Sequence, residues 1–138
     1  MAQAPSSSSS VDLGLLVHRL GYAALLIALH GWPRTVRVWN HFVHGEPWGF
    51  INLVAGIGFP MPAVFAVLSV LAESIGAVLL IPGLWTRWAA GILAINFIVA
   101  VASEGAKGDP IELPALYLLG ALTLALAGPG RFSLDARR

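Results

Sequence analysis

Four long apolar segments, separated by short polar breaks, dominate the pattern of hydrophobic and polar positions along the chain. At 1.5 Å of rise per helical residue, each segment would measure roughly 26–30 Å, which is close to the thickness of the hydrocarbon core of a membrane. The pattern therefore predicts four membrane-spanning helices. They run from about Leu13 to Trp32, Pro62 to Pro82, Leu84 to Ser103 and Ile111 to Gly128.

The stretch between the first two spans, residues 33–61, has a different pattern. Its first half mixes aromatic, basic and histidine side chains, namely Arg34, Arg37, Trp39, His41, Phe42, His44 and Trp48. So many polar groups disfavour a continuous span, whereas an amphipathic helix lying in the membrane interface accommodates both kinds of side chain. The predicted fold is all-α: a membrane-embedded four-helix bundle with an additional interfacial helix between spans one and two.

The composition points to the same class of protein. Of the 138 residues, 57% are hydrophobic and 11% are charged, whereas soluble domains usually carry about 25% charged residues. The lipid bilayer is therefore the expected surrounding, and a net charge of +1 gives no indication of a nucleic-acid partner. The chain has no cysteine, which excludes disulfides, thiolate metal sites and a dithiol relay within it.

The start of the chain differs from the rest. Residues 1–12 contain the serine run Ser6 to Ser10, and such low-complexity polar stretches are typical of disorder. The first ten residues contain no Lys or Arg, so they lack the basic region of a cleavable signal peptide. We therefore predict a disordered tail over residues 1–12 and one four-span membrane domain over residues 13–138.

The distribution of Lys and Arg predicts the orientation in the membrane. Four spans place both termini on one side, and that side would hold Arg87, Arg131, Arg137 and Arg138. The other side would mix three basic residues with four acidic ones, Glu46, Glu104, Asp109 and Glu112. The positive-inside rule then predicts an inner-membrane protein with both termini in the cytoplasm.

Glu73 stands near the middle of the second span, where an ionised carboxylate costs roughly 2.5–3.5 kcal/mol on insertion scales. Helical spacing places small residues on the same face, including Ala66, Ser69, Gly76 and Ala77. Small residues allow helices to approach closely in lipid. Glu73 is therefore predicted to point into the bundle, where a buried carboxylate requires an ion-pair partner or a functional role.

Arg19 in the first span is the expected partner, because a long arginine side chain can bridge the difference in depth. We predict an intramembrane ion pair between Arg19 and Glu73, with Asn96 or Ser69 completing the hydrogen bonds. Eleven residues make nearly three helical turns, so His30 shares a face with Arg19. Such a pocket could hold a quinone, a proton path or a small polar substrate. The alternative is a purely structural clamp between helices one and two.

The four histidines raise the question of a haem or a metal. His18 and His30 lie near opposite ends of one predicted helix, so they suit bis-histidine haem ligation poorly. His41 and His44 with Glu46 could ligate a metal, but this spacing is common by chance, and we predict no metal site. The sequence also lacks the glycine-rich phosphate loop and the hydrolase and metalloprotease motifs. No catalytic residue is assigned.

Several short motifs resemble the DoxX family of small four-helix membrane proteins, although the loop between spans one and two is longer than is usual there. The resemblance implies a four-helix membrane bundle that handles quinone electrons, since the family is named after a subunit associated with a thiosulfate:quinone oxidoreductase. The matching pieces are Arg19 with His30-Gly31-Trp32, Gly58-Phe59-Pro60, Glu73 with Gly76, Gly83-Leu84-Trp85-Thr86-Arg87, and the tail Gly128-Pro129-Gly130-Arg131-Phe132-Ser133-Leu134-Asp135.

Two functions compete, and the sequence does not decide whether the protein is an enzyme. The first is a subunit of a quinone-linked oxidoreductase complex, which would require a partner membrane or peripheral redox protein. The second is a non-catalytic scaffold or docking subunit, and a small-solute carrier built around Glu73 is a weaker alternative. A homo-oligomer remains open in each case. The candidate polar pocket consists of Glu73, Arg19, His30, Asn96 and Ser69.

Overall fold

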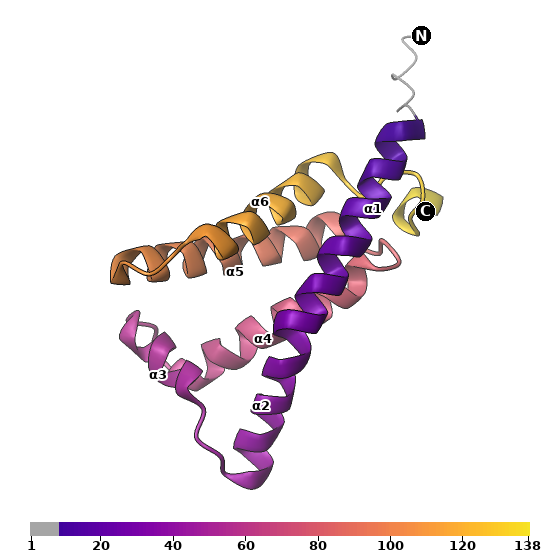
Figure 1. Ribbon diagram of the computed structural model, residues 1–138. Helices are drawn as coiled ribbons and strands as arrows, with labels where there is room; N and C mark the ends of the chain where they lie inside the picture. Colours follow the sequence, from indigo (N-terminus) through magenta and orange to yellow (C-terminus); the bar gives the residue numbers. More distant parts are fainter. Residues whose placement is uncertain (1–8) are drawn as a thin grey trace.

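The computed structural model describes residues 9–138, and within that range it consists of helices and connecting turns without a strand (Figure 1). This confirms the predicted class, an all-α membrane bundle. The helices are α1 (Ser9–Leu26), the π-helix η1 (Ile27–Gly31), α2 (Trp32–His44), α3 (Gly49–Gly56), α4 (Pro62–Leu80), α5 (Thr86–Lys107), α6 (Glu112–Ala127) and the short 3-10 helix η2 (Asp135–Arg137).

The first three of these helices form one continuous rod, Ser9–His44, of 36 residues. The helix predicted between spans one and two is therefore present, but it continues the first span instead of forming a separate element. Pro33 has no backbone N–H to donate and normally interrupts a helix. Here it lies in the first turn of α2, directly after the π-helix, and a π-turn changes the hydrogen-bond register where that donor is missing.

Among residues 9–138, three helical segments are long and apolar enough to cross a membrane: the rod, α4 and α5. The rod would measure about 54 Å at 1.5 Å per residue, which exceeds a hydrocarbon core of about 30 Å. It must therefore tilt or leave the membrane at one end. The fourth apolar helix, α6, has 16 residues and would measure about 24 Å, so it is shorter than the fourth span that the pattern predicts.

The helices splay apart in one direction (Figure 1). Helices α5 and α6 form an antiparallel pair, α5 also packs on α4, and α1 crosses α4 and contacts α6. The short α3 packs on α4. Close approach depends on small residues: a Cβ at Gly76 would lie 3.1 Å from Cγ of Leu93, and one at Gly120 would lie 2.7 Å from the Tyr22 ring. The inward, small-residue face predicted for the second span is thus confirmed, and Glu73 lies on it.

The C-terminal tail folds back across the turn between α4 and α5. The carboxylate of Asp135 accepts hydrogen bonds from the backbone N–H groups of Trp85 and Thr86, both at 2.8 Å, and so caps the start of α5. The backbone N–H of Arg131 donates to Asp12 at 3.0 Å. Both ends of the described chain therefore lie at the same end of the bundle.

Most of the predicted disordered tail, residues 1–12, falls outside the described residues. The last four residues of that range already belong to helix α1, which begins at Ser9. Asp12 is buried in this first turn, where its carboxylate receives the hydrogen bond from the tail. Helix α1 therefore begins a few residues before the predicted end of the tail.

Candidate functional site

Glu73 lies near the middle of α4 and is 1% exposed. Nη1 of Arg34, on α2, donates to Oε1 at 2.6 Å and to Oε2 at 2.8 Å. Nδ2 of Asn96, on α5, donates to Oε1 at 3.0 Å, and Oγ of Ser69 donates to Oδ1 of Asn96 at 2.8 Å. These four residues, which we call the Glu73 cluster, connect α2, α4 and α5.

Arg34 is the residue that sequence reasoning missed, and the predicted ion pair between Arg19 and Glu73 does not form. The sequence pattern predicts Arg34 on an interfacial helix outside the bundle. Because α1, η1 and α2 form one rod, Arg34 instead lies beside α4. Its side chain is 32% exposed, and its guanidinium lies 5.2 Å from the centre of the Phe50 ring. The cation is therefore reachable from the surface, whereas the carboxylate is not.

Arg19 is buried in the middle of α1 and binds the C-terminal tail. Its Nη1 donates to the carbonyl oxygen of Pro129 at 2.6 Å, and its Nη2 donates to that of Phe132 at 2.8 Å. A Cβ at Gly83 would lie 2.6 Å from Nη1 of Arg19. Gly83 lies in the turn after α4, and the last residue of that helix, Leu80, is already seven residues, or about 10 Å of helix, beyond Glu73. Arg19 is therefore too far from the carboxylate to reach it.

His30 lies in the π-helix, four residues before Arg34. Its ring meets the Tyr117 ring edge-on, with 5.1 Å between ring centres. Its Nε2 is buried and has no hydrogen-bond partner among the described residues. A buried imidazole nitrogen without a partner is costly, so this atom marks a place where a further polar group would be stabilised.

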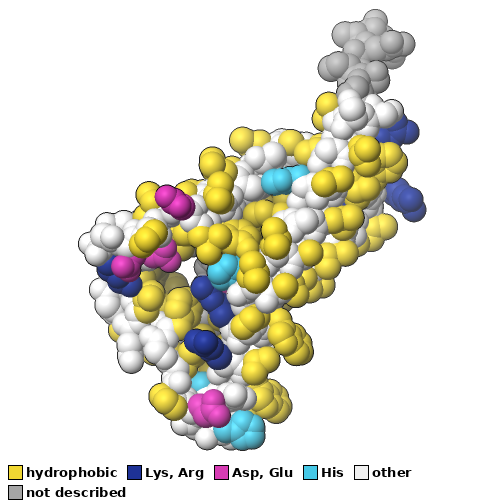
Figure 2. Space-filling view, viewed as in Figure 1, with side chains coloured by type: hydrophobic (Ala, Val, Ile, Leu, Met, Phe, Trp, Pro, Cys, Tyr) yellow, Lys and Arg dark blue, Asp and Glu magenta, His cyan; other side chains and the backbone are white. Residues whose placement is uncertain are grey.

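Tyr117 joins His30 to a small aromatic cluster beside the carboxylate. Its ring stacks on Phe97 with 5.1 Å between centres, and meets Tyr22 edge-on at 5.6 Å. Glu73 lies close enough to Tyr22 and Tyr117 to interact with them electrostatically. Figure 2 shows a hollow on this face of the molecule, with basic, histidine and acidic side chains around it.

A second set of polar contacts fixes the rod against α4. Oγ of Ser74 donates to the carbonyl oxygen of Gly31 at 3.3 Å and lies 3.0 Å from Oγ1 of Thr35. A Cβ at Gly31 would lie 3.3 Å from the same Ser74 oxygen. Glycine thus permits the close approach that brings Arg34 within reach of Glu73. In the sequence, Arg34 follows His30 by four residues and Thr35 follows Gly31 by four, so each pair lies on one face if the helix continues through Pro33. This spacing is the available signal that Arg34 could face the bundle.

The Glu73 cluster therefore contains Glu73, Asn96 and Ser69, as predicted, together with Arg34 in place of Arg19. His30 lies beside it through Tyr117 and interacts electrostatically with Arg34. Within residues 9–138, no group of three or more His, Asp or Glu side chains is arranged to hold a metal ion. Nδ1 of His41 donates to the backbone carbonyl oxygen of Glu46, 2.7 Å away.

Comparisons with known proteins identify the family. The family model of DoxX matches residues 14–104, which include all four residues of the Glu73 cluster. The inner membrane protein YphA of Escherichia coli (strain K12) is 33% identical over 101 residues, which cover 64% of this chain and 71% of that protein. No solved structure matches. With three membrane-length helices and a family model that covers most of its length, this chain is an integral membrane protein that belongs to the DoxX family.

Proposed function

We propose that this protein is the membrane subunit of a quinone-linked oxidoreductase complex and that it binds the quinone headgroup beside the Glu73 cluster. The observation that carries the proposal is the buried Nε2 of His30, which has no partner among the described residues. It lies one helical turn from Arg34, whose guanidinium binds the buried carboxylate of Glu73. A carbonyl oxygen is the kind of group that a donor in such a position binds.

The residues fit the chemistry of a quinone. A quinone supplies a centre that takes up two electrons and two protons, with carbonyl oxygens as its polar handles. His30 would donate to one carbonyl oxygen, while the rings of Tyr117 and Phe97 offer flat apolar contacts. The Glu73 carboxylate would take up a proton and pass it to the headgroup. The partly exposed Arg34 provides a polar connection from that carboxylate toward the surface.

Quinone content tests this proposal directly. We expect the protein purified from its native membrane to contain extractable quinone, measured by ultraviolet absorbance and chromatography. His30→Ala and Glu73→Gln should lower the quinone content several-fold, whereas His44→Ala, an exposed histidine on the same rod, should not. The proposal is wrong if the folded wild-type protein holds no quinone, or if all three variants retain the wild-type amount.

A docking role is the second candidate, and helix α2 supports it. This helix has no buried residue, and its large apolar side chains are exposed. Photo-crosslinking from Trp39, compared with crosslinking from Leu116 on α6, would test it. A docking subunit should form one discrete heteromeric product from the first position alone. The exposed side chains are Trp32, Val36, Trp39, Phe42 and Val43.

We also propose that both termini face the cytoplasm. The support is the distribution of charge along the bundle. Four arginines, at positions 87, 131, 137 and 138, belong to the end where Asp12 meets the tail. Four acidic residues lie in the loops at the other end or in the adjoining helix ends, namely Glu46, Glu104, Asp109 and Glu112. C-terminal fusions to a cytoplasm-active and a periplasm-active reporter enzyme should give activity with the cytoplasmic reporter only. The opposite result would contradict this orientation.

A further inference from the structure

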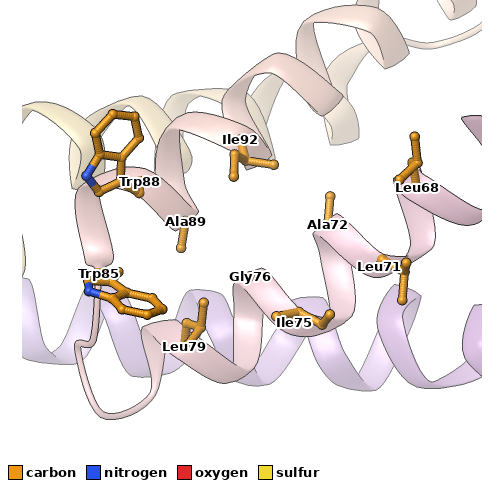
Figure 3. A pocket seen from close by; sticks show the side chains of 10 residues that line it. All are labelled: Leu68, Leu71, Ala72, Ile75, Gly76, Leu79, Trp85, Trp88, Ala89 and Ile92. Carbon is orange, nitrogen blue, oxygen red and sulfur yellow. The ribbon is translucent and has the colours of Figure 1, made fainter.

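We propose that the groove between α4 and α5 is a specific binding site for one anionic phospholipid, with an acyl chain in the groove and the phosphate at Arg87. This site is separate from the Glu73 cluster and does not depend on the quinone proposal. Figure 3 shows the groove between the two helices, with Trp85 and Trp88 at one end and Leu68 at the other.

The groove has the shape and chemistry of an acyl-chain site. It has a volume of about 570 Å³ and is lined by apolar side chains and Gly76. On α4 it extends from Leu79 to Leu68, which corresponds to about 16 Å along a helix. One leaflet of a membrane with a hydrocarbon core of about 30 Å has half that thickness, about 15 Å. The groove therefore matches the depth of one leaflet.

A second, more polar hollow continues from the tryptophan end. It has a volume of about 470 Å³, shares Trp85 and Trp88 with the groove, and is also lined by Arg87 and Asp135. The two tryptophans are 56% and 78% exposed, and tryptophan is enriched at the level of lipid headgroups. The apolar groove thus lies on the hydrocarbon side of the two tryptophans, and the polar hollow lies on their headgroup side.

Arg87 supplies the charge that selects an anion. It forms no ion pair and no hydrogen bond with any residue of the described chain, and its Nε and Nη2 lie over Gly128. The acidic residue in the same hollow, Asp135, is already engaged by the backbone N–H groups at the start of α5. A free guanidinium beside a headgroup-sized hollow fits a phosphate, which arginine binds through two parallel hydrogen bonds.

Native mass spectrometry of the detergent-solubilised full chain tests the site. Phosphatidylglycerol and phosphatidylcholine with identical acyl chains are titrated separately. We expect one tightly bound phosphatidylglycerol and at least several-fold weaker binding of phosphatidylcholine. Arg87→Gln should raise the dissociation constant for phosphatidylglycerol about tenfold, because the loss of one charged hydrogen bond weakens binding by roughly that factor. Arg137→Gln removes an exposed charge from the same end of the bundle and should change binding less than twofold, roughly as a surface charge does.

A second pair of variants tests the groove independently of the charge. Ala72→Phe fills the groove, so it should abolish binding of the lipid, whereas Ala102→Phe adds the same ring on the exposed face of α5 and should leave lipid binding unchanged.

Glycerol phosphate at millimolar concentration should fail to displace the lipid; displacement would show that the hollow binds free phosphate instead. Equal binding of both lipids, no effect of Ala72→Phe, or a dimer that Ala72→Phe dissociates would each overturn the proposal.

Discussion

One nitrogen of Arg34 bridges both carboxylate oxygens of Glu73, at 2.6 and 2.8 Å, although the two residues are 39 positions apart in the chain. The carboxylate is buried in the middle of a membrane-length helix, and the guanidinium comes from the continuation of the first span. This pair, with Asn96, ties the rod to α4 and α5. It determines both how the helices dock and where the candidate site lies.

Breaking this pair from the arginine side should destabilise the fold, because it leaves a buried carboxylate without its cation. We expect Arg34→Ala to lower the free energy of unfolding by about 2–4 kcal/mol, somewhat below the range for fully buried pairs because Arg34 is partly exposed. Adding Glu73→Gln should recover part of the loss. Reversible unfolding in mixed micelles measures both. Arg37→Ala, an exposed arginine one turn away, should change stability by less than about 0.5 kcal/mol.

Arg19 should matter for the C-terminal tail and not for the Glu73 cluster. Replacing it by methionine removes two hydrogen bonds to tail carbonyls, and charged hydrogen bonds of this kind contribute about 1.5–3 kcal/mol each. We expect Arg19→Met to expose residues 129–138 to proteolysis, detected by mass spectrometry of the cleaved chain. Arg34→Ala should leave the tail protected. If Arg19→Met instead reproduced the effects of Glu73→Gln, the assignment of Arg19 to the tail would be wrong.

Gly120 should tolerate no side chain, because it faces the Tyr22 ring across the contact between α1 and α6. A Cβ there would lie 2.7 Å from two ring carbons, and overpacking of this kind costs about 1–3 kcal/mol. We therefore expect Gly120→Ala to lower the midpoint of thermal unfolding. Gly91→Ala is the matched control, since nothing lies within 4 Å of a Cβ at that position of α5. Its midpoint should stay unchanged or rise.

The cap formed by Asp135 should depend on pH. Partial burial acts to raise the pKa of this carboxyl, but the hydrogen bonds from Thr86 and Trp85 and the charge of Arg138 outweigh it, so the pKa lies below the ordinary value of 3.8. A lowered pKa in the folded state means that the cap stabilises the fold above the ordinary pKa and loses this contribution as the pH falls through the lowered value.

Hydrogen exchange at the start of α5 measures this effect. Between pH 6 and pH 4 the protection of the backbone amides of Trp85 and Thr86 should remain constant after correction for intrinsic rates, and it should fall only at pH values below the ordinary pKa of aspartate. In Asp135→Asn the protection should be low throughout and independent of pH. Full protection of these amides in Asp135→Asn at pH 6 would show that another group caps α5.

The local pattern of residues predicts the secondary structure and its environment well. Length and apolar content mark the spans, because a membrane sets a minimum length and leaves each backbone polar group to be satisfied within its own helix. The small residues around Glu73 predict that it faces inward, and Ser69 follows from the same helical spacing. Asn96 is expected beside them as a polar residue within the third span. The motifs that resemble the DoxX family lie largely within the residues that the family model matches, 14–104.

The sequence by itself thus determined an all-helical membrane protein with a buried carboxylate on a small-residue face. Only the tertiary structure decided which cation that carboxylate binds. Pro33 predicts a helix end, but the helix continues through the π-helix before it into α2. Gly31 lets this rod pack closely against Ser74. The choice between Arg19 and Arg34 depends on this continuation and on how two helices cross. The spacing of residues within one segment therefore cannot predict it.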